Sequence, residues 1–179
     1  MVSKYSYLLL KPDVSRDILY PLIVKDVEVA GFDVIKHQSC QLNEKQIEAI
    51  YKKHKEKEWF PKLVDFLMKD SCLLLIVKQK DIKDKQPAGK ILDAVESINQ
   101  FKGKVFQGGL REKYRLAKNQ DKFFENRVHT PDSYQEFLEN LSLLLDNEAL
   151  NDLRLREPEL YDSLLRYQRE GKELKIYKR

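Results

Sequence analysis

The sequence has no apolar run long enough to cross a membrane. Its longest such runs, Tyr7–Leu10 and Cys72–Val77, are far shorter than the roughly 20 residues of a spanning helix. The N-terminus also lacks the basic stretch followed by an apolar stretch that marks a secretory signal. With 179 residues, of which 42% are apolar, the chain is long enough to bury one substantial core. These observations predict a single domain without a membrane segment, located in the cytoplasm.

Cysteine is scarce, and both cysteines, Cys40 and Cys72, lie in apolar stretches typical of β-strands. No CxxC motif or cluster of cysteine and histidine surrounds them, so the sequence indicates neither a zinc site nor a framework of disulfides. We expect both side chains to be small buried hydrophobic groups. The sequence therefore assigns no metal ligands.

A large excess of one charge is also lacking, because 33 basic and 29 acidic residues leave a formal net charge of only +4. A dedicated nucleic-acid-binding domain is usually more basic. The lysine-rich stretch Lys52–Lys57 fits a solvated helix face. The composition disfavours nucleic acid as a partner, and it still supplies the few cations that a small phosphate-bearing ligand needs.

Common nucleotide-binding and catalytic motifs are missing. The P-loop pattern GxxxxGK[ST] does not occur, since Gly89-Lys90 lacks both the upstream glycine and the following hydroxyl residue, and GxGxxG is absent too. The HExxH motif of zinc proteases and the HRD and DFG motifs of protein kinases are also absent. Any phosphate site in this chain must therefore be built from side chains.

Alternating and helical apolar patterns predict strands that alternate with helices. The strands are expected at Tyr5–Leu10, Phe32–Leu42, Cys72–Lys78 and Asn126–His129. Helices are expected between a cap at Ser15 and a stop at Gly31, after the cap Asn43, over Pro61–Met68, around Gly89–Ile98, and from the turn Thr130–Ser133 to near Leu145. Residues 99–125 lack a clear period and are expected to form a long loop.

This order of elements fits an α+β fold of the ferredoxin-like type, in which helices cover an antiparallel β-sheet. We divide the chain into a domain of residues 1–146 and a C-terminal extension of residues 147–179. The extension reads as an amphipathic helix followed by a basic tail, and Pro158 is expected to break that helix.

Three histidines are available for chemistry. His37 lies in the middle of a predicted strand and His54 in a lysine-rich helix, so we expect structural or solvated roles for both. His129 lies at a strand end, three residues after Asn126 and just before a helix start whose free N–H groups favour an anion. A buried, hydrogen-bonded histidine would fit the same position. The local pattern alone therefore leaves the role of His129 open.

Four segments in a fixed order bear on that question. They are Lys11-Pro12-Asp13, Trp59-Phe60-Pro61-Lys62-Leu63-Val64, Leu110-Arg111, and Asn126-Arg127-Val128-His129-Thr130-Pro131-Asp132-Ser133. Their order resembles that in nucleoside diphosphate kinases, and the resemblance covers most of residues 4 to 145. No single tetrapeptide is decisive, but the ordered set is specific.

The resemblance implies a role for each matching residue. His129 matches the histidine that is phosphorylated, and the implied activity transfers the γ-phosphoryl group of ATP to a nucleoside diphosphate by a ping-pong mechanism. The implied nucleotide-binding residues are Lys11 and Arg111 at the phosphates, Asn126 at the sugar hydroxyl, Trp59 against the base, Tyr51 near the histidine, and Lys90 in place of a helix arginine.

The chemistry of these residue types is consistent with the implied roles. Phosphoryl transfer depends mostly on positioning and charge stabilisation, which Lys11 and Arg111 would supply. A neutral imidazole is a nucleophile near pH 7. Because an aromatic ring binds any base through its face, Trp59 predicts broad base specificity. Mg²⁺ is expected to bind together with the nucleotide, through its phosphates. The resemblance also implies that the protein is a homo-oligomer.

Several positions depart from the family pattern. Pro131 stands where a serine can hydrogen-bond near the histidine, and Asn140 aligns with a glutamate that orients the imidazole. Asp132 fits either a role through a water molecule or a helix N-cap. A catalytically weak or inactive nucleotide-binding scaffold of the same fold is therefore an alternative function. RNA binding on the sheet would need exposed aromatic residues on the central strands, and the apolar run from Leu73 to Val77 argues against it.

Overall fold

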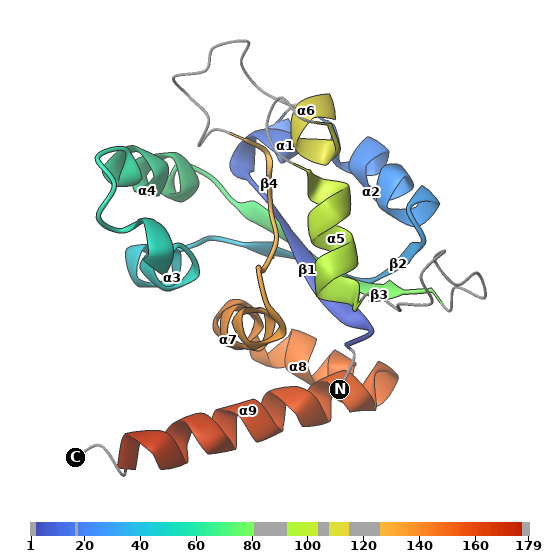
Figure 1. Cartoon of the computed structure of the whole chain (residues 1–179), viewed down its shortest axis with the longest axis vertical. Helices are drawn as coiled ribbons and strands as arrows, with labels where there is room; N and C mark the ends of the chain where they lie inside the picture. Colours follow the sequence, from blue (N-terminus) through green and yellow to red (C-terminus); the bar gives the residue numbers. More distant parts are fainter. Residues whose placement is uncertain (1–2, 17, 81–92, 104–107, 115–125, 177–179) are drawn as a thin grey trace.

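The computed structural model describes residues 3–16, 18–80, 93–103, 108–114 and 126–176. Within these ranges a four-stranded antiparallel β-sheet runs through the molecule, with helices on both faces (Figure 1). The strands are β1 (Tyr5–Leu10), β2 (Phe32–Cys40), β3 (Cys72–Gln79) and β4 (Val128–His129), in the order β2-β3-β1-β4. The α+β fold predicted from the sequence is confirmed.

β1 lies inside the sheet because its sequence is apolar on both faces. All six of its residues are buried. Tyr7 and Leu9 join the core on one face of the sheet, and Leu8 and Leu10 join the core on the other. This pattern explains why a continuous apolar run, rather than a strict alternation, forms the strand that ends at Leu10, directly before Lys11.

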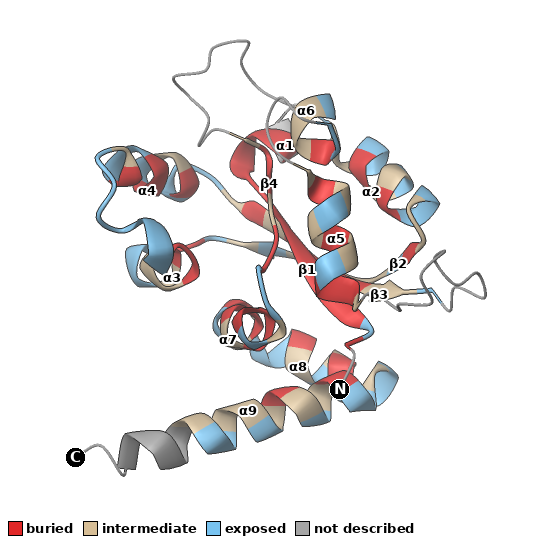
Figure 2. Cartoon of the chain, in the orientation of Figure 1, coloured by how far each residue is buried: buried red, intermediate tan, exposed pale blue. Residues whose placement is uncertain are grey.

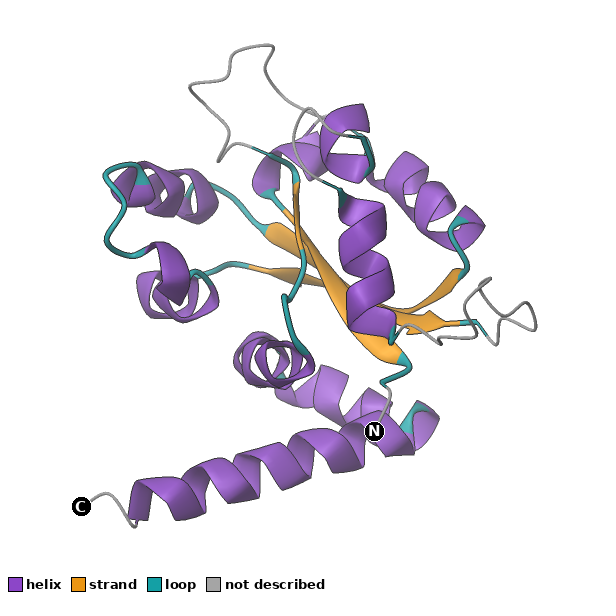
Figure 3. Ribbon diagram, in the orientation of Figure 1, coloured by secondary structure: helices purple, strands orange, loops and turns teal. Residues whose placement is uncertain are grey.

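The helices divide between the two faces of the sheet (Figure 3). One face is covered by α1 (Pro12–Arg16), α2 (Tyr20–Val29), α5 (Ala94–Lys102) and α6 (Leu110–Lys113). The other face is covered by α3 (Glu44–Ile50), α4 (Phe60–Met68), α7 (Tyr134–Leu144), α8 (Asn147–Arg156) and α9 (Pro158–Ile176), with the short 3₁₀ helix η1 (Lys52–His54) between α3 and α4. Buried residues follow the sheet and the helix sides that face it (Figure 2).

Helix starts agree only in part with the predicted caps. Asn43 caps α3 as predicted, in a reciprocal capping box with Gln46. Ser15 lies inside α1 and does not cap α2, which starts after Leu19 without a side-chain cap. The predicted cap at Ser15 was wrong because the chain makes a separate short helix directly after β1.

The predicted loop of residues 99–125 is partly helical. α5 starts at Ala94, capped by Asp93, and continues to Lys102, so it lies about one turn beyond the helix predicted around Gly89–Ile98. A second short helix, α6, follows after Gly109. Gly103 ends α5 with a φ of 66°, a left-handed conformation that favours glycine. Residues 81–92, 104–107 and 115–125 lie outside the described part of the chain.

The C-terminal extension forms two helices that meet at Pro158, as predicted. Leu153 of α8 and Leu160 and Leu164 of α9 belong to the same core as β1 and α7. At the junction, the carboxylate of Glu157 accepts a hydrogen bond of 2.8 Å from the Tyr5 hydroxyl. The extension therefore shares its apolar core with the sheet. In the described ranges, no helix is both long and apolar enough to cross a membrane.

Candidate active site

His129 ends β4, where it pairs with Leu9 of the central strand. Its ring packs against Tyr51, with ring centroids 4.6 Å apart, and its centroid lies 6.2 Å from that of Tyr7. The residue is partly exposed, but its Nε2 atom is buried and has no hydrogen-bond partner among the described residues. The histidine thus lies at the border of the core and does not point wholly into it.

Burial and nearby cations keep His129 uncharged. Loss of hydration lowers the pKa of His129 well below its ordinary value of 6.5, and Arg111, Lys102 and Lys11 lower this pKa further. A histidine with a lowered pKa binds a proton only in more acidic solution and is neutral at pH 7. The electrostatics therefore favour the uncharged imidazole expected from the sequence.

Lys11 and Arg111 reach the neighbourhood of His129 from two separate elements. Lys11 follows β1 and is only 2% exposed, and its Nζ lies 5.8 Å from the centroid of the Tyr51 ring that packs against His129. Arg111 lies in α6, and its Nε donates a hydrogen bond of 3.0 Å to the carbonyl of Val128. The structure therefore brings the two predicted phosphate-binding cations together at the histidine.

A buried ion pair fixes this end of the sheet. Nε of Arg127 lies 2.8 Å from Oδ2 of Asp13, and the two side chains are 8% and 1% exposed. The backbone N–H of Lys11 also donates a 3.0 Å hydrogen bond to the carbonyl of Arg127. These contacts tie the segment after β1 to the segment before β4, where Asn126 lies partly buried. The pair therefore joins the two segments that carry Lys11 and Asn126.

The remaining predicted nucleotide-binding residues lie in different settings. Tyr51 is buried at the end of α3. Trp59 is partly exposed at the start of α4, and its ring centroid lies 5.2 Å from that of His54, which in turn is close enough to His129 to lower its pKa. Lys90 lies outside the described residues and precedes the first residue of α5. The contacts described therefore connect every predicted residue except Lys90 and Asn126 to the surroundings of the His129 ring.

Asn140, in α7, is fully buried but does not orient the ring by a direct hydrogen bond. Its Nδ2 donates a 2.8 Å hydrogen bond to the hydroxyl of Tyr7, and its Oδ1 has no partner among the described residues. Tyr7 packs near His129, so this tyrosine links the amide of Asn140 to the histidine ring. An asparagine, being neutral, also gives an imidazolium less stabilisation than a carboxylate would.

Asp132 does not cap α7, so that part of the prediction was wrong. Ser133 is the N-cap, and its hydroxyl accepts a 3.2 Å hydrogen bond from the backbone N–H of Glu136. Asp132 instead pairs with Lys53, whose Nζ lies 2.9 Å from Oδ2 of Asp132 and 2.9 Å from Oε2 of Glu136. Lys53 therefore bridges two carboxylates at the start of α7.

Lys102 is a residue near His129 that was not predicted from the sequence. This residue is the last of α5, is only 8% exposed, and lies near enough to His129 to lower its pKa. A lysine in the last turn of a helix, directly before a helix-ending glycine, is a recognisable signal. It was hidden because residues 99–102 were assigned to a loop, and because the burial of a lysine is a property of the tertiary structure.

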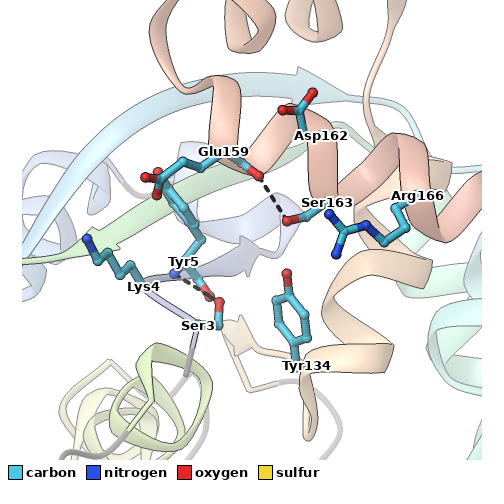
Figure 4. Close-up of a pocket in the computed structure, with 8 residues that line it drawn as sticks. All are labelled: Ser3, Lys4, Tyr5, Tyr134, Glu159, Asp162, Ser163 and Arg166. Carbon is cyan, nitrogen blue, oxygen red and sulfur yellow. Dashed lines mark hydrogen bonds between the residues drawn. The ribbon is translucent and has the colours of Figure 1, made fainter. Parts of the chain in front are cut away.

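A separate cavity of about 450 Å³ lies between the start of β1, Tyr134 of α7 and α9 (Figure 4). Its lining residues are Ser3, Lys4, Tyr5, Tyr134, Glu159, Asp162, Ser163 and Arg166. None of the predicted site residues lines this cavity. It is therefore distinct from the group of residues around His129.

Comparisons with known proteins agree on one family. The model of the family described as nucleoside diphosphate kinase matches residues 4–150. A nucleoside diphosphate kinase of Erythrobacter litoralis is 24% identical over 145 residues, which cover 81% of this chain and 95% of that protein. A nucleoside diphosphate kinase of Saccharolobus solfataricus is 23% identical over 155 residues, which cover 84% of this chain and 100% of that protein.

Solved structures extend the comparison to the fold. The crystal structure of nucleoside diphosphate kinase from Encephalitozoon cuniculi aligns with a TM-score of 0.65 and 16% identity, and covers 82% of this chain and 91% of that chain. The structure of the nucleoside diphosphate kinase from Aquifex aeolicus aligns with a TM-score of 0.64 and 15% identity. The alignment covers 83% of this chain and 99% of that chain. At such identities the likeness shows that the fold is shared.

Proposed function

The chain belongs to the nucleoside diphosphate kinase family, and from this premise we propose that it transfers the γ-phosphoryl group of a nucleoside triphosphate to a nucleoside diphosphate through His129. The observation that carries the proposal is the neutral imidazole with Lys11 and Arg111 beside it. Attack on a polyphosphate requires an uncharged nucleophile and cations that stabilise the phosphate oxygens.

Transfer proceeds in two half-reactions. In the first, a nitrogen of the neutral His129 ring attacks the γ-phosphorus of the donor, a P–N bond forms, and the bond to the bridging β-phosphate oxygen breaks. The nucleoside diphosphate leaves with the electron pair of that bond. In the second, a terminal oxygen of another nucleoside diphosphate attacks the phosphorus and the P–N bond breaks. Because the two half-reactions mirror one another, one nucleotide site serves both, and the kinetics are ping-pong.

Lys11 and Arg111 have two effects on this reaction. Their charges stabilise the negative oxygens of the transferring group, which is the main source of catalysis in phosphoryl transfer. The same charges lower the pKa of His129, so the unprotonated nucleophile predominates at pH 7. Burial of Lys11 and the hydrogen bond from Arg111 to Val128 hold both cations in place before the substrate arrives.

The same proposal assigns the base, sugar and metal contacts. Trp59, partly exposed, is proposed to bind the base through its ring face, and Asn126 the sugar hydroxyl. Among the described residues, no group of three or more histidine, cysteine or acidic side chains is arranged to hold a metal. The cations around His129 instead fit the phosphates of a nucleotide that brings its own Mg²⁺. The proposed substrate is therefore the Mg²⁺ complex of the nucleotide.

Turnover tests the proposed function. ATP labelled in its γ-phosphate is mixed with a second nucleoside diphosphate, and labelled nucleoside triphosphate is measured with wild type and with His129→Ala. His37→Ala is the matched control, because His37 is exposed on β2. We expect activity in wild type and in the control and its loss in His129→Ala. Equal activity in all three proteins would refute the role of His129.

A catalytically weak scaffold of the same fold is the second candidate, and Asn140 is the observation that favours it. Its amide is bound to Tyr7, so no carboxylate stabilises positive charge on the His129 ring from this position. The turnover assay decides between the two, because a scaffold binds nucleotide without exchanging label.

We also propose that the protein is a homo-oligomer, which sedimentation of the full chain would test.

A further inference from the structure

Lys102 is a buried cation without an acidic partner in the described part of the chain. Its residue is 8% exposed, and its Nζ donates a 2.5 Å hydrogen bond to Oδ1 of Asn99, which is neutral. Charged side chains are almost never fully buried unless an opposite charge or a ligand compensates them. The position therefore calls for a negative group that the described residues do not supply.

The two acidic side chains that act on Lys102 already pair with another lysine. Asp132 and Glu136 both affect the pKa of Lys102, but each accepts a 2.9 Å contact from Nζ of Lys53. Arg111 and Lys53 also face Lys102 and repel its charge. Lys102 thus interacts with two other cations and with carboxylates that already pair with Lys53.

Asn99 holds Lys102 against the turn that follows His129. Nδ2 of Asn99 donates a 2.6 Å hydrogen bond to the carbonyl of Pro131, and Oδ1 accepts a 2.6 Å hydrogen bond from the hydroxyl of Thr130. The same Oδ1 binds Nζ of Lys102. The end of α5 is therefore connected directly to the two residues after His129, and Lys102 is held there by its own hydrogen bond to Asn99.

The three cations Lys11, Arg111 and Lys102 converge on one small region. Each of them lowers the pKa of His129, so all three act on the same ring. Buried like charges repel one another at short range, and a polyphosphate is the natural counter-ion for such a group. Lys102 differs from the other two because the sequence motifs of the family did not point to it.

We propose that Lys102 binds the terminal phosphate of the nucleotide and takes up a proton when the nucleotide binds. This inference rests on the proposed nucleotide site at His129 but not on transfer of the phosphoryl group. In the protein without nucleotide, burial and the neighbouring Arg111 oppose the charge on Lys102. A bound phosphate reverses this effect, because it places negative charge next to the ammonium group.

The direction and size of the proton uptake follow from the pKa of Lys102 in the protein without nucleotide. Burial, followed by the charge of Arg111, lowers the pKa of Lys102 to about 8. At pH 8.5 roughly a quarter of the free protein then carries this proton, whereas nearly all of the phosphate-bound protein carries it. Binding should therefore take up about 0.7 proton per site at pH 8.5. Nucleotide affinity should fall as the pH rises above 8, since the missing proton must first be supplied.

The experiment is calorimetric titration of the full chain with ADP at pH 8.5, in buffers of different ionisation enthalpy. The phosphates of ADP are fully ionised at this pH, since their second pKa is about 6, so the ligand itself neither gains nor loses a proton. Wild type is compared with Lys102→Met, which keeps the length of the side chain without its charge, and with Lys102→Arg, which stays charged at every pH used. Lys113→Met is the control, because Lys113 is exposed and pairs with Asp26.

We expect Lys102→Met to weaken ADP binding roughly 10-fold or more, as the loss of a hydrogen bond to a charged group should. Lys102→Arg should retain binding but lose the proton uptake, and the control should match wild type in both. Unchanged affinity and proton uptake in Lys102→Met would overturn the inference. If the label test on His129 fails while these differences remain, the proposed transfer is wrong and the Lys102 site stands.

Discussion

The buried pair of Asp13 and Arg127 gives the sharpest prediction about how the fold positions the site. Their charges are 2.8 Å apart in the core. At an effective dielectric constant of about 20, the attraction is about 6 kcal/mol, which the hydration lost on burial partly offsets. Asp13→Asn or Arg127→Met breaks this buried ion pair from one side, so each should lower the free energy of unfolding by about 3 to 5 kcal/mol.

Urea denaturation is a suitable assay, because the fluorescence of Trp59, the single tryptophan, reports unfolding. In the double variant no lone charge remains, so it should lose clearly less stability than the sum of the two single variants. Asp26→Asn is the control, since the Asp26–Lys113 pair is more exposed and should be worth less than about 1 kcal/mol. Single losses below about 1 kcal/mol, or strictly additive losses, would refute the reasoning.

Three further predictions concern the ring, the base and the extension. Arg111→Gln removes a cation that lowers the pKa of His129, so this pKa should rise toward 6.5 in an NMR titration, and an unchanged value would contradict the electrostatic account. Trp59→Ala should raise KM for purine and pyrimidine nucleotides by similar factors of roughly 10. A change for one class alone would show that Trp59 discriminates between the bases. Leu160→Ala should lower the free energy of unfolding by about 2 to 5 kcal/mol in thermal denaturation, because Leu160 is fully buried, and a loss near zero would show that the extension does not share the core.

The sequence predicted the sheet well because its strands are defined by local composition. The run before Lys11 is apolar on both faces, and the turn after it contains proline, so both the strand and its end are visible without a structure. Asn43 was recognised as a cap for a similar reason, because its side chain accepts a hydrogen bond from Gln46, three residues further along the same helix turn. Features that depend on a few neighbouring residues were therefore predictable.

Features that depend on contacts between distant segments could not be predicted from the sequence. Residues 99–102 have mixed character. Their helix is stabilised by Ile98 and by two hydrogen bonds between Asn99 and the turn after His129, one donated by Asn99 and one accepted by it. The burial of Lys102 follows from that packing and has no local signature. Asp132 was a plausible cap in isolation, but Ser133 took that role while Lys53, far away in the sequence, bound the carboxylate.

The most direct test of the central claim is to look for the covalent intermediate itself. The protein is incubated with γ-labelled ATP in the absence of any acceptor, and the label on the protein is then followed in acid and in base. We predict one acid-labile, base-stable phosphoryl group on His129, which a nucleoside diphosphate removes on addition. A protein that takes up no label, or a His129→Ala variant labelled as strongly as wild type, would contradict the claim that His129 carries the phosphoryl group.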